Sequence, residues 1–383
     1  MGRINQIRET DVFVVAENVL SPLGKTTAEN FAQLTQNQSG VRQHQTGISP
    51  VDFYASLFSN TETFIKDNGH NYTKFEQLLI ASVSDALNNS GIDVGGKKTA
   101  LIISSTKGNI SLLETEKNSP QLNKRIALST SAKLVAEYFG FANKPIIISN
   151  ACVSGVMAII TGMRLLRSGQ YENTVIVGAD VISEFILSGF QSFMALSANV
   201  CKPFDKSRDG LNLGEGAGTI ILSTNKKYAQ NLKVLGGGVS NDANHISGPS
   251  RTGEELAFAI KTAMSDAAVS SRDIDFISAH GTATVYNDEM EANAIALSGL
   301  QSVPLNSLKG YYGHTLGAAG LIESIISIQS LKRELVLPTP GFEESGVTQQ
   351  VNVITSPLSV KANHFLKTAS GFGGCNAAVV FGK

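Results

Sequence analysis

The strand-to-helix junction at residues 150–155 constrains the fold of this chain more than any other stretch. Asn150-Ala151-Cys152-Val153-Ser154-Gly155 follows an apolar run, Pro145 to Ile148, and opens a helix of small residues, Val156 to Ser168. At such a junction the backbone N–H groups and the helix dipole both lower the pKa of a thiol, which stabilises the nucleophilic thiolate. A buried structural cysteine is the alternative, because free Cys is among the most buried residue types. This stretch alone leaves both interpretations open.

Composition and cysteine usage narrow the class of protein. The chain has 383 residues, enough for two domains or one large duplicated domain. Its net charge of −1 offers no positive field for nucleic acid or an anionic membrane, so neither is expected as a partner. The three cysteines form no C-x-x-C pair, which argues against disulfides and a zinc site, so no metal is expected. Without a signal-peptide core or an apolar run near the roughly 20 residues of a membrane span, a cytoplasmic protein is expected.

Strand-like and helix-like stretches alternate along the chain. An amphipathic helix, Phe75 to Asn89, lies between the β-rich runs Asp11 to Ala16 and Thr99 to Ser104. A buried-strand run, Asn173 to Asp180, follows the Cys152 helix. Such alternation is typical of βαβ units and predicts an α/β protein whose sheets are covered by helices.

Two further strands are predicted at the middle of the chain. Gly216 to Ser223 and Leu232 to Val239 are both rich in apolar residues, and the polar turn Thr224 to Tyr228 separates them. We expect these two strands to pair with each other.

The chain carries a faint internal repeat. A small-residue helix follows His314, as one follows the cysteine junction, and each part then closes in a Gly-containing turn and an apolar strand, at residues 216–222 and 374–381. Two such halves indicate a duplication. We expect an N-terminal half over residues 1–228 and a C-terminal half over residues 229–383.

Two of the six histidines stand in unusually Gly- and Thr-rich surroundings. His280 follows a predicted strand in Ser278-Ala279-His280-Gly281-Thr282-Ala283-Thr284, and His314 precedes a helix in Lys309-Gly310-Tyr311-Tyr312-Gly313-His314-Thr315. Flanking glycines permit a ligand to approach the backbone closely, which favours a functional role over a core or loop histidine. The others lie in polar, turn-like contexts and are expected at the surface: His44, His70, His245 and His364.

Several motifs, taken in order, resemble those of a known family. They are Asn150-Ala151-Cys152-Val153-Ser154-Gly155, Pro203-Phe204-Asp205-Lys206-Ser207-Arg208-Asp209-Gly210, Leu213-Gly214-Glu215-Gly216-Ala217-Gly218, His280-Gly281-Thr282-Ala283-Thr284, the Lys309-to-His314 run with Gly317-Ala318-Ala319-Gly320, and Gly371-Phe372-Gly373-Gly374. Ser21-Pro22-Leu23-Gly24 extends the match toward the N-terminus. In these motifs the chain resembles the β-ketoacyl–acyl carrier protein synthases, the condensing-enzyme branch of the thiolase superfamily.

The resemblance implies the thiolase fold, in which two duplicated βαβαβ halves pack as five layers, α-β-α-β-α. The N-terminal half would carry the nucleophile Cys152, which takes the acyl chain as a thioester from acyl carrier protein. The C-terminal half would carry His280 and His314, which bind the malonyl thioester carbonyl and promote decarboxylation. The carbanion then attacks the Cys152 thioester and gives a β-keto product two carbons longer. Neutral imidazoles suit this task because they stabilise enolate charge without protonating carbon early.

The resemblance also assigns roles to residues around these three. The N–H groups of Cys152 and Phe372 would form the oxyanion hole. The Phe372 ring would act as a gate between the two half-reactions, with a core aromatic in a Gly-rich turn as the alternative. Asp288 and Glu291 match an acidic pair that is expected to hold the histidine loop.

Two further pairs match the family's motifs. Lys309 matches its active-site lysine and Glu323 the glutamate partnered with that lysine, a pair that would tune the charge of the histidines; a purely structural pair is the alternative. Thr282 and Thr284 would bind the pantetheine arm of the carrier protein.

The chain also departs from the family's pattern. Gly310 stands where Ser usually follows the active-site lysine, Cys375 replaces a Thr, and Ser370 stands where an aromatic residue is common. None of these departures removes a catalytic group. Together they predict a divergent member, serving fatty acid synthesis or a specialised polyene or polyketide pathway.

Partners and alternatives follow from the same resemblance. We expect acyl carrier protein as a partner, and a homodimer or a heterodimer with a related ketosynthase-like subunit. The Thr106-to-Asn109 segment, too polar for a core, supports a dimer indirectly. No cofactor is expected, since the substrates are carried on the phosphopantetheine of the carrier protein. Two alternatives stay open: a non-catalytic subunit of the chain-length-factor kind, which typically lacks the cysteine, and a degradative thiolase, which normally has one histidine and a second catalytic cysteine.

Overall fold

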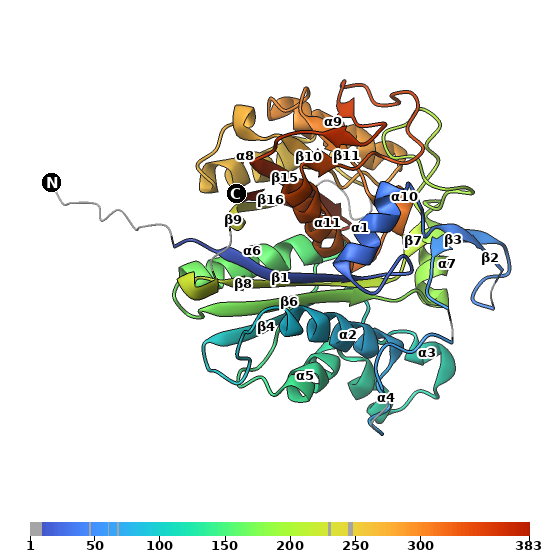
Figure 1. Cartoon of the computed structure of the whole chain (residues 1–383). Helices are drawn as coiled ribbons and strands as arrows, with labels where there is room; N and C mark the ends of the chain where they lie inside the picture. Colours follow the sequence, from blue (N-terminus) through green and yellow to red (C-terminus); the bar gives the residue numbers. More distant parts are fainter. Residues whose placement is uncertain (1–9, 46, 60, 67–68, 229–230, 244–247) are drawn as a thin grey trace.

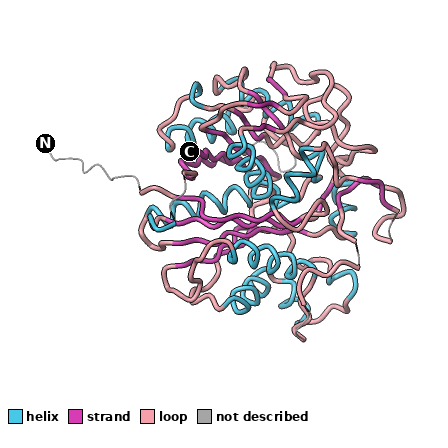
Figure 2. The backbone as a smooth tube through the Cα atoms, in the orientation of Figure 1, coloured by secondary structure: helices cyan, strands magenta, loops and turns pink. Residues whose placement is uncertain are grey.

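Five layers of helices and strands stack on one another, as Figure 1 shows. The outer helical layers contain α2 (Lys74–Asn88) with α5 (Leu128–Phe139), and α8 (Glu254–Asp266) with α9 (Val285–Leu297). The inner helical layer contains α6 (Ser154–Arg167) and α11 (Ala319–Arg333), with a layer of strands on either side. Figure 2 shows these strands running across the middle of the molecule. The computed structural model describes residues 10–45, 47–59, 61–66, 69–228, 231–243 and 248–383. The α-β-α-β-α arrangement expected from the resemblance is confirmed.

The two strand layers repeat one pattern. The first joins, in spatial order, β1 (Phe13–Leu20), β8 (Gly216–Ser223), β6 (Asn173–Asp180), β4 (Thr99–Ser104) and β5 (Ile146–Ile148). The second joins β9 (Lys233–Asn241), β16 (Cys375–Gly382), β15 (His364–Gly371), β10 (Phe276–Ser278) and β11 (Pro304–Asn306), with β13 (Asn352–Val353) at the edge. In each, the first two pairings are antiparallel and the next two are parallel. This repeated topology is the mark of a duplicated chain.

Strands β1 and β9 touch and join both layers into one sheet of 11 strands. Phe13 pairs with Lys233, and the N–H of Val14 donates to the carbonyl of Leu232 at 3.0 Å. The prediction that Gly216–Ser223 pairs with the strand after it is therefore wrong, because β1 lies between β8 and β9. Local sequence does not show this, since the inserted strand comes from the start of the chain.

Small residues allow α6 and α11 to approach closely in the inner layer. A Cβ on Gly155 would lie 2.7 Å from the backbone N of Leu321, and one on Gly320 would lie 2.6 Å from Val156. Larger side chains would push the two helices apart. The small-residue helices predicted after Cys152 and His314 thus form the centre of the molecule.

Capping residues and apolar runs account for the elements around this centre. The hydroxyl of Thr73 accepts from the N–H of Glu76, whose carboxylate accepts from the N–H of Thr73, so a capping box starts α2 close to the predicted Phe75. The strands β4 and β8 are buried along their whole length, as expected for strands covered by helices on both faces.

The loop after β4 is partly buried, so the prediction that Thr106 to Asn109 is too polar for the core is wrong for part of this segment. Gly108 and Asn109 are buried, and Lys107 is exposed. The Asn109 amide donates to Glu76 at 3.0 Å and to Ser131 at 2.9 Å. Asn109 is therefore a satisfied core residue, because its hydrogen bonds offset the cost of burial.

The remaining described elements lie in the connections between layers. They are α1 (Thr27–Thr35), β2 (Arg42–His44), β3 (Phe53–Ser56), α3 (Leu112–Thr115), α4 (Pro120–Ile126), α7 (Glu184–Ser192), β7 (Leu213–Gly214), α10 (Lys309–Tyr312), β12 (Leu335–Val336) and β14 (Leu358–Ser359), with short 3-10 turns at Lys226–Tyr228, Ser271–Asp273 and Leu316–Ala318. None of the described helices combines the length and apolar character that crossing a bilayer requires.

Candidate active site

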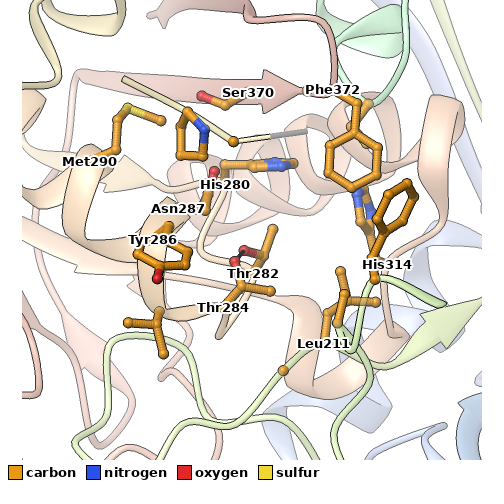
Figure 3. Close-up of a pocket in the computed structure, with 18 of the residues that line it drawn as sticks. Leu211, His280, Thr282, Thr284, Tyr286, Asn287, Met290, His314, Ser370 and Phe372 are labelled. Atoms are coloured by element: carbon orange, nitrogen blue, oxygen red, sulfur yellow. Dashed lines mark hydrogen bonds between the residues drawn. The ribbon is translucent and has the colours of Figure 1, made fainter. Parts of the chain in front are cut away.

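A cavity of about 410 Å³ receives side chains from both halves of the chain. Cys152 reaches it from the N-terminal half, and His280, His314 and Phe372 reach it from the C-terminal half. Figure 3 shows His314 beside the Phe372 ring, and His280 farther along the same cavity. The structure therefore brings together residues that three separate motifs predicted.

Cys152 sits on a tight turn two residues before α6 begins. Ala151 holds a φ of 43°, which is unusual for a residue with a side chain. Ser154 fixes the turn, since its hydroxyl accepts from the Asn150 N–H at 2.8 Å and donates to the Ala151 carbonyl at 2.6 Å. Gly371 approaches the turn so closely that a Cβ there would lie 2.9 Å from the Cys152 N. The turn directs the half-buried Cys152 toward the cavity.

The acidity expected for this cysteine is not found. Burial raises the pKa of the Cys152 thiol to about 12, while the Lys309 ammonium nearby opposes the shift. The prediction of a lowered pKa is therefore wrong in direction. Removal of water from around the sulfur penalises the charged form more than the positive groups favour it. Burial therefore favours the neutral form of the Cys152 thiol.

Two carboxylates hold the loop that carries His280. The N–H of His280 donates to Glu291 at 2.8 Å, and the N–H of Gly281 donates to the same carboxylate at 2.7 Å. Asp288 accepts from the N–H of Thr282 at 2.9 Å and from the N–H of Phe204 at 2.7 Å. The expectation that Asp288 and Glu291 hold this loop is confirmed.

His314 is fixed by backbone contacts with the segment around β7. Its N–H donates to the Asn212 carbonyl at 2.6 Å, and its carbonyl accepts from the Gly214 N–H at 3.1 Å. A Cβ on Gly214 would lie 1.9 Å from the Tyr312 carbonyl oxygen, so only glycine fits. Among the described residues, the buried Nδ1 of His314 has no hydrogen-bond partner.

The two imidazoles lie next to each other, edge to face, inside the protein. Their ring centroids lie 5.3 Å apart at an angle of 81°, and both rings are buried. Burial, followed by the Lys309 ammonium, lowers the pKa of each histidine well below its usual 6.5. Both are therefore neutral at pH 7, which agrees with the neutral donors that the resemblance implies.

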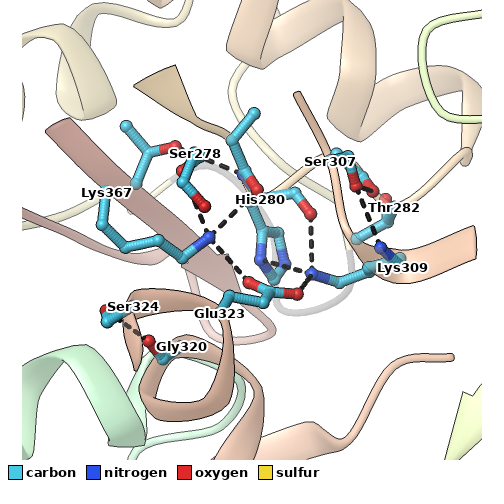
Figure 4. A network of polar contacts seen from close by, with 12 residues as sticks. Ser278, His280, Thr282, Ser307, Lys309, Gly320, Glu323, Ser324 and Lys367 are labelled. Carbon is cyan, nitrogen blue, oxygen red and sulfur yellow. Dashed lines mark hydrogen bonds and ion pairs between the residues drawn. The ribbon is translucent and has the colours of Figure 1, made fainter. Parts of the chain in front are cut away.

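A buried ionic network lies behind His280, as Figure 4 shows. The Lys309 Nζ donates to the Glu323 carboxylate at 2.6 Å and to the His280 carbonyl at 2.7 Å, and it lies 3.5 Å from the His280 Nδ1. An ammonium can only donate, so this contact leaves the proton of neutral His280 on Nε2. Lys367 contacts the other carboxylate oxygen of Glu323 at 2.6 Å.

Lys367 and Asp180 are site residues that the sequence reasoning missed. Asp180, buried at the end of β6, accepts from the Gly317 N–H at 2.7 Å and the Ser105 hydroxyl at 2.8 Å. Burial raises its pKa to about 6, although these hydrogen bonds oppose the shift. Asp180 thereby ties the segment before α11 to the end of β4. The sequence shows a charged residue within or at the end of an otherwise apolar strand in both cases, but it does not show which groups that charge contacts.

Phe372 occupies the turn between β15 and β16. Its ring stacks on Phe190 at 5.9 Å between centroids and meets Phe193 edge-on at 5.4 Å. The following Gly373 and Gly374 have φ values of 85° and 77°, which only glycine adopts readily. Phe372 is 41% exposed, so the alternative of a core aromatic is wrong.

Two threonines line the cavity on the side away from Phe372. The hydroxyls of Thr282 and Thr284 lie 2.8 Å apart and share a hydrogen bond. Tyr286, 72% exposed, lies in the same part of the cavity. The opening therefore combines hydroxyl groups with an apolar rim.

The other histidines and cysteines lie apart from these groups or behind them. His70 is exposed, His44 and His364 are half-buried, and His245 lies outside the described residues. Cys201 is buried, and the Sγ of buried Cys375 lies 3.4 Å from the Phe372 carbonyl. Across the described ranges, no cluster of His, Cys, Asp and Glu is placed to hold a metal ion.

Comparison with known proteins gives consistent matches over most of the chain. The family model described as "Beta-ketoacyl synthase, N-terminal domain" matches residues 9–227, and "Beta-ketoacyl synthase, C-terminal domain" matches residues 232–343. The 3-oxoacyl-[acyl-carrier-protein] synthase 2 of Vibrio harveyi is 30% identical over 97% of this chain and 98% of its own. The ishigamide ketosynthase/chain length factor superposes with a TM-score of 0.88 at 25% identity, over 98% of this chain and 99% of the other. A ketosynthase in complex with its chain length factor from Xenorhabdus doucetiae shares the fold, with a TM-score of 0.86 at 24% identity over 100% of both chains.

Proposed function

This chain belongs to the beta-ketoacyl synthase family, and from that premise we propose that it catalyses a decarboxylative Claisen condensation. An acyl group on Cys152 condenses with malonyl–acyl carrier protein and yields a β-ketoacyl–carrier protein two carbons longer. One observation carries the proposal: a cysteine and two adjacent, neutral imidazoles line the same cavity.

Acyl transfer to Cys152 is the first half-reaction. The Cys152 sulfur forms a bond to the acyl carbon, the carrier thioester breaks, and the thiol proton of Cys152 passes to the departing carrier thiol. The N–H groups of Cys152 and Phe372 form the oxyanion hole. In its support, a Cβ on Gly371 would lie 2.9 Å from the Cys152 N, so the turn that carries Phe372 lies directly against the Cys152 turn. Backbone donors aimed at the developing charge stabilise the tetrahedral intermediate.

Decarboxylation and condensation form the second half-reaction. The malonyl thioester carbonyl accepts hydrogen bonds from the Nε2–H groups of His280 and His314. These bonds strengthen as the carbon–carboxylate bond breaks and carbon dioxide leaves, because enolate charge collects on that oxygen. The carbanion attacks the Cys152 acyl carbon, the carbon–sulfur bond breaks, and the sulfur takes up a proton. Lys309 and Glu323 fix the tautomer and position of His280 from behind.

Carrier and partner complete the proposal. Thr282 and Thr284 bind the pantetheine arm of acyl carrier protein, on which the substrates arrive, so the reaction needs no other cofactor. Two proteins of similar fold are the ishigamide ketosynthase/chain length factor and a ketosynthase in complex with its chain length factor, so a heterodimer with a related subunit is our preferred assembly over a homodimer. The divergent motifs support a specialised polyene or polyketide pathway, and the three free cysteines support a cytoplasmic setting.

A non-catalytic subunit of the chain-length-factor kind is the second candidate, supported by the likeness to the ishigamide ketosynthase/chain length factor and to the Xenorhabdus ketosynthase in complex with its chain length factor. The presence of Cys152 opposes it. A thiolase is opposed by the two histidines, and Cys375 does not supply its second cysteine because it follows the glycine turn.

Separate assays of the two half-reactions test the proposal. His280→Ala or His314→Ala should slow carbon dioxide release from malonyl–carrier protein by about 10²-fold or more, the scale of losing one oxyanion donor. Acyl transfer to Cys152 should survive in part, because its oxyanion hole is backbone. His364→Ala is the matched control. His364 is the first residue of β15, at the end of that strand opposite to Gly371 and the cavity, and its ring contacts the Asp273 carbonyl. A His280→Ala variant that decarboxylates at the wild-type rate contradicts the mechanism.

A further inference from the structure

Lys367 is a fully buried lysine on β15 that belongs to none of the motifs described above. Its ammonium donates to the carbonyl of Ser278 at 3.2 Å and to that of Ala279 at 3.0 Å. It also contacts the Glu323 carboxylate at 2.6 Å. Burying an ammonium group costs free energy unless hydrogen bonds and an opposite charge compensate it. These three contacts supply that compensation for Lys367.

Two lysines together hold three consecutive carbonyls next to the imidazole of His280. Lys367 holds those of Ser278 and Ala279, and Lys309 holds that of His280 itself at 2.7 Å. Glu323 bridges the two ammonium groups, with one carboxylate oxygen 2.6 Å from each. Figure 4 shows Glu323 between the two lysines and His280 above them. The backbone that carries His280 is therefore held by two buried lysine side chains, one from β15 and one from α10.

The same network sets the charge beside both imidazoles. Two lysine side chains share the one bridging carboxylate of Glu323. Burial lowers the pKa of the Lys367 ammonium, while the Glu323 and Glu291 carboxylates oppose the shift and favour its charged form. The groups that face this cluster are Lys309 and Tyr312 from α10, Glu323 from α11, Glu291 from α9 and the two histidines. The positive charge of Lys367 contributes to the lowered pKa of His280 and of His314.

We propose that Lys367 is a positioning residue of the condensation site, which clamps the His280 backbone through Ser278 and Ala279 and supplies the second positive charge beside both imidazoles. The inference rests on the proposed function for its catalytic meaning. It goes beyond that function in assigning a role to a residue outside the cysteine, histidine and lysine motifs.

A pH series with four variants tests this role. In Lys367→Met the pKa values of His280 and His314 should rise toward 6.5, so decarboxylation should fall at a higher pH, with its acid limb shifted up by about one unit. Lys367→Arg keeps the charge and should keep the limb. Glu323→Gln removes the bridging negative charge and should shift the limb the opposite way, to lower pH. Lys74→Met breaks an ion pair of the same 2.6 Å length away from the histidines and should leave the limb unchanged.

Carbon-13 NMR titration of labelled histidines provides a readout independent of turnover. The proposal predicts that two histidine pKa values rise in Lys367→Met and stay in Lys367→Arg. A Lys367→Met protein with a lower Tm but unchanged histidine pKa values and acid limb would show a merely structural lysine. If Lys367→Met does not fold, Lys367→Gln takes its place in the pH series and the NMR titration, and an unshifted acid limb with unchanged histidine pKa values overturns the proposal. A wild-type protein that releases no carbon dioxide would sink the proposed function instead, and the NMR titration would still report on Lys367.

Discussion

Access, more than acidity, distinguishes the three cysteines. Burial raises the pKa of Cys152 and of Cys201 to about 12, and it also raises that of Cys375. Cys152 alone of the three is half-buried and lines the cavity; the other two are buried. The helix-terminal position predicted from the sequence therefore matters because it presents the sulfur to a substrate. Once an acyl thioester is bound, its position next to the Cys152 sulfur favours acyl transfer.

Cys152 should be the residue whose alkylation abolishes condensation. Limited iodoacetamide treatment, followed by peptide mapping, should place the label on Cys152 in step with inactivation, because the other thiols are shielded. Cys201→Ala is the matched control and should remain equally sensitive to the reagent. Complete inactivation with label confined to Cys201 or Cys375 would overturn the assignment.

At this scale, the sequence predicted the residues that stand in motifs and missed those that stand alone. His280 and His314 lie beside glycines that allow close approach, and Cys152 lies at a strand-to-helix junction; both patterns are visible without a structure. Lys367 and Asp180 are single charged residues in strands, and their partners come from distant segments. Only the tertiary fold shows that such a charge is paired, so no local pattern could assign them.

The turn between β15 and β16 lies between the Cys152 turn and the aromatic side of the cavity, where it can control the entry of substrate. Gly371 packs against the Cys152 turn, and the Phe372 ring covers the cavity on the side of Phe190 and Phe193. The ring is partly exposed, and the two glycines after it give the backbone freedom to move. These features suit a gate that opens for the acyl chain and closes for the malonyl unit.

Phe372→Ala should impair ordered acylation while the Tm stays within about 3 °C of wild type, since a partly exposed ring contributes little to the core. Stopped-flow acylation kinetics and calorimetry measure the two effects. Phe258→Ala is the matched control, because Phe258 is an exposed aromatic on α8. It should change neither quantity. If Phe372→Ala is acylated at the normal rate but has a much lower Tm, Phe372 has a packing role and the gate proposal is wrong.

At the level of elements, the sequence predicted where strands begin and end better than it predicted which strands pair. The runs Thr99–Ser104, Asn173–Asp180 and Gly216–Ser223 are strands with the expected bounds, because continuous apolar runs mark buried strands. The pairing of the last was wrong, since β1 inserts beside it. Hydrophobic periodicity specifies a strand but carries no information about which strand lies next to it.

The whole molecule places its chemistry where the two halves meet. The N-terminal half supplies the nucleophile and the C-terminal half supplies both imidazoles, and the inner helices α6 and α11 pack the halves together. Glycines at that contact explain why small-residue helices recur in the sequence. The five-layer fold was predictable from the ordered motifs. The joining of both strand layers into one sheet of 11 strands was not predictable, because it depends on a short pairing between β1 and β9, which are far apart in the sequence.

A single-turnover experiment tests the central claim of an active condensing enzyme most directly. Protein purified with its partners from the native host, acylated on Cys152, is mixed with malonyl–carrier protein, and mass spectrometry follows the acyl group. We predict that the acyl mass leaves Cys152 and reappears on the carrier protein as a β-ketoacyl chain two carbons longer, with one carbon dioxide released per chain. Retention of the acyl group on Cys152 with no extended product would contradict the account and favour a non-catalytic subunit.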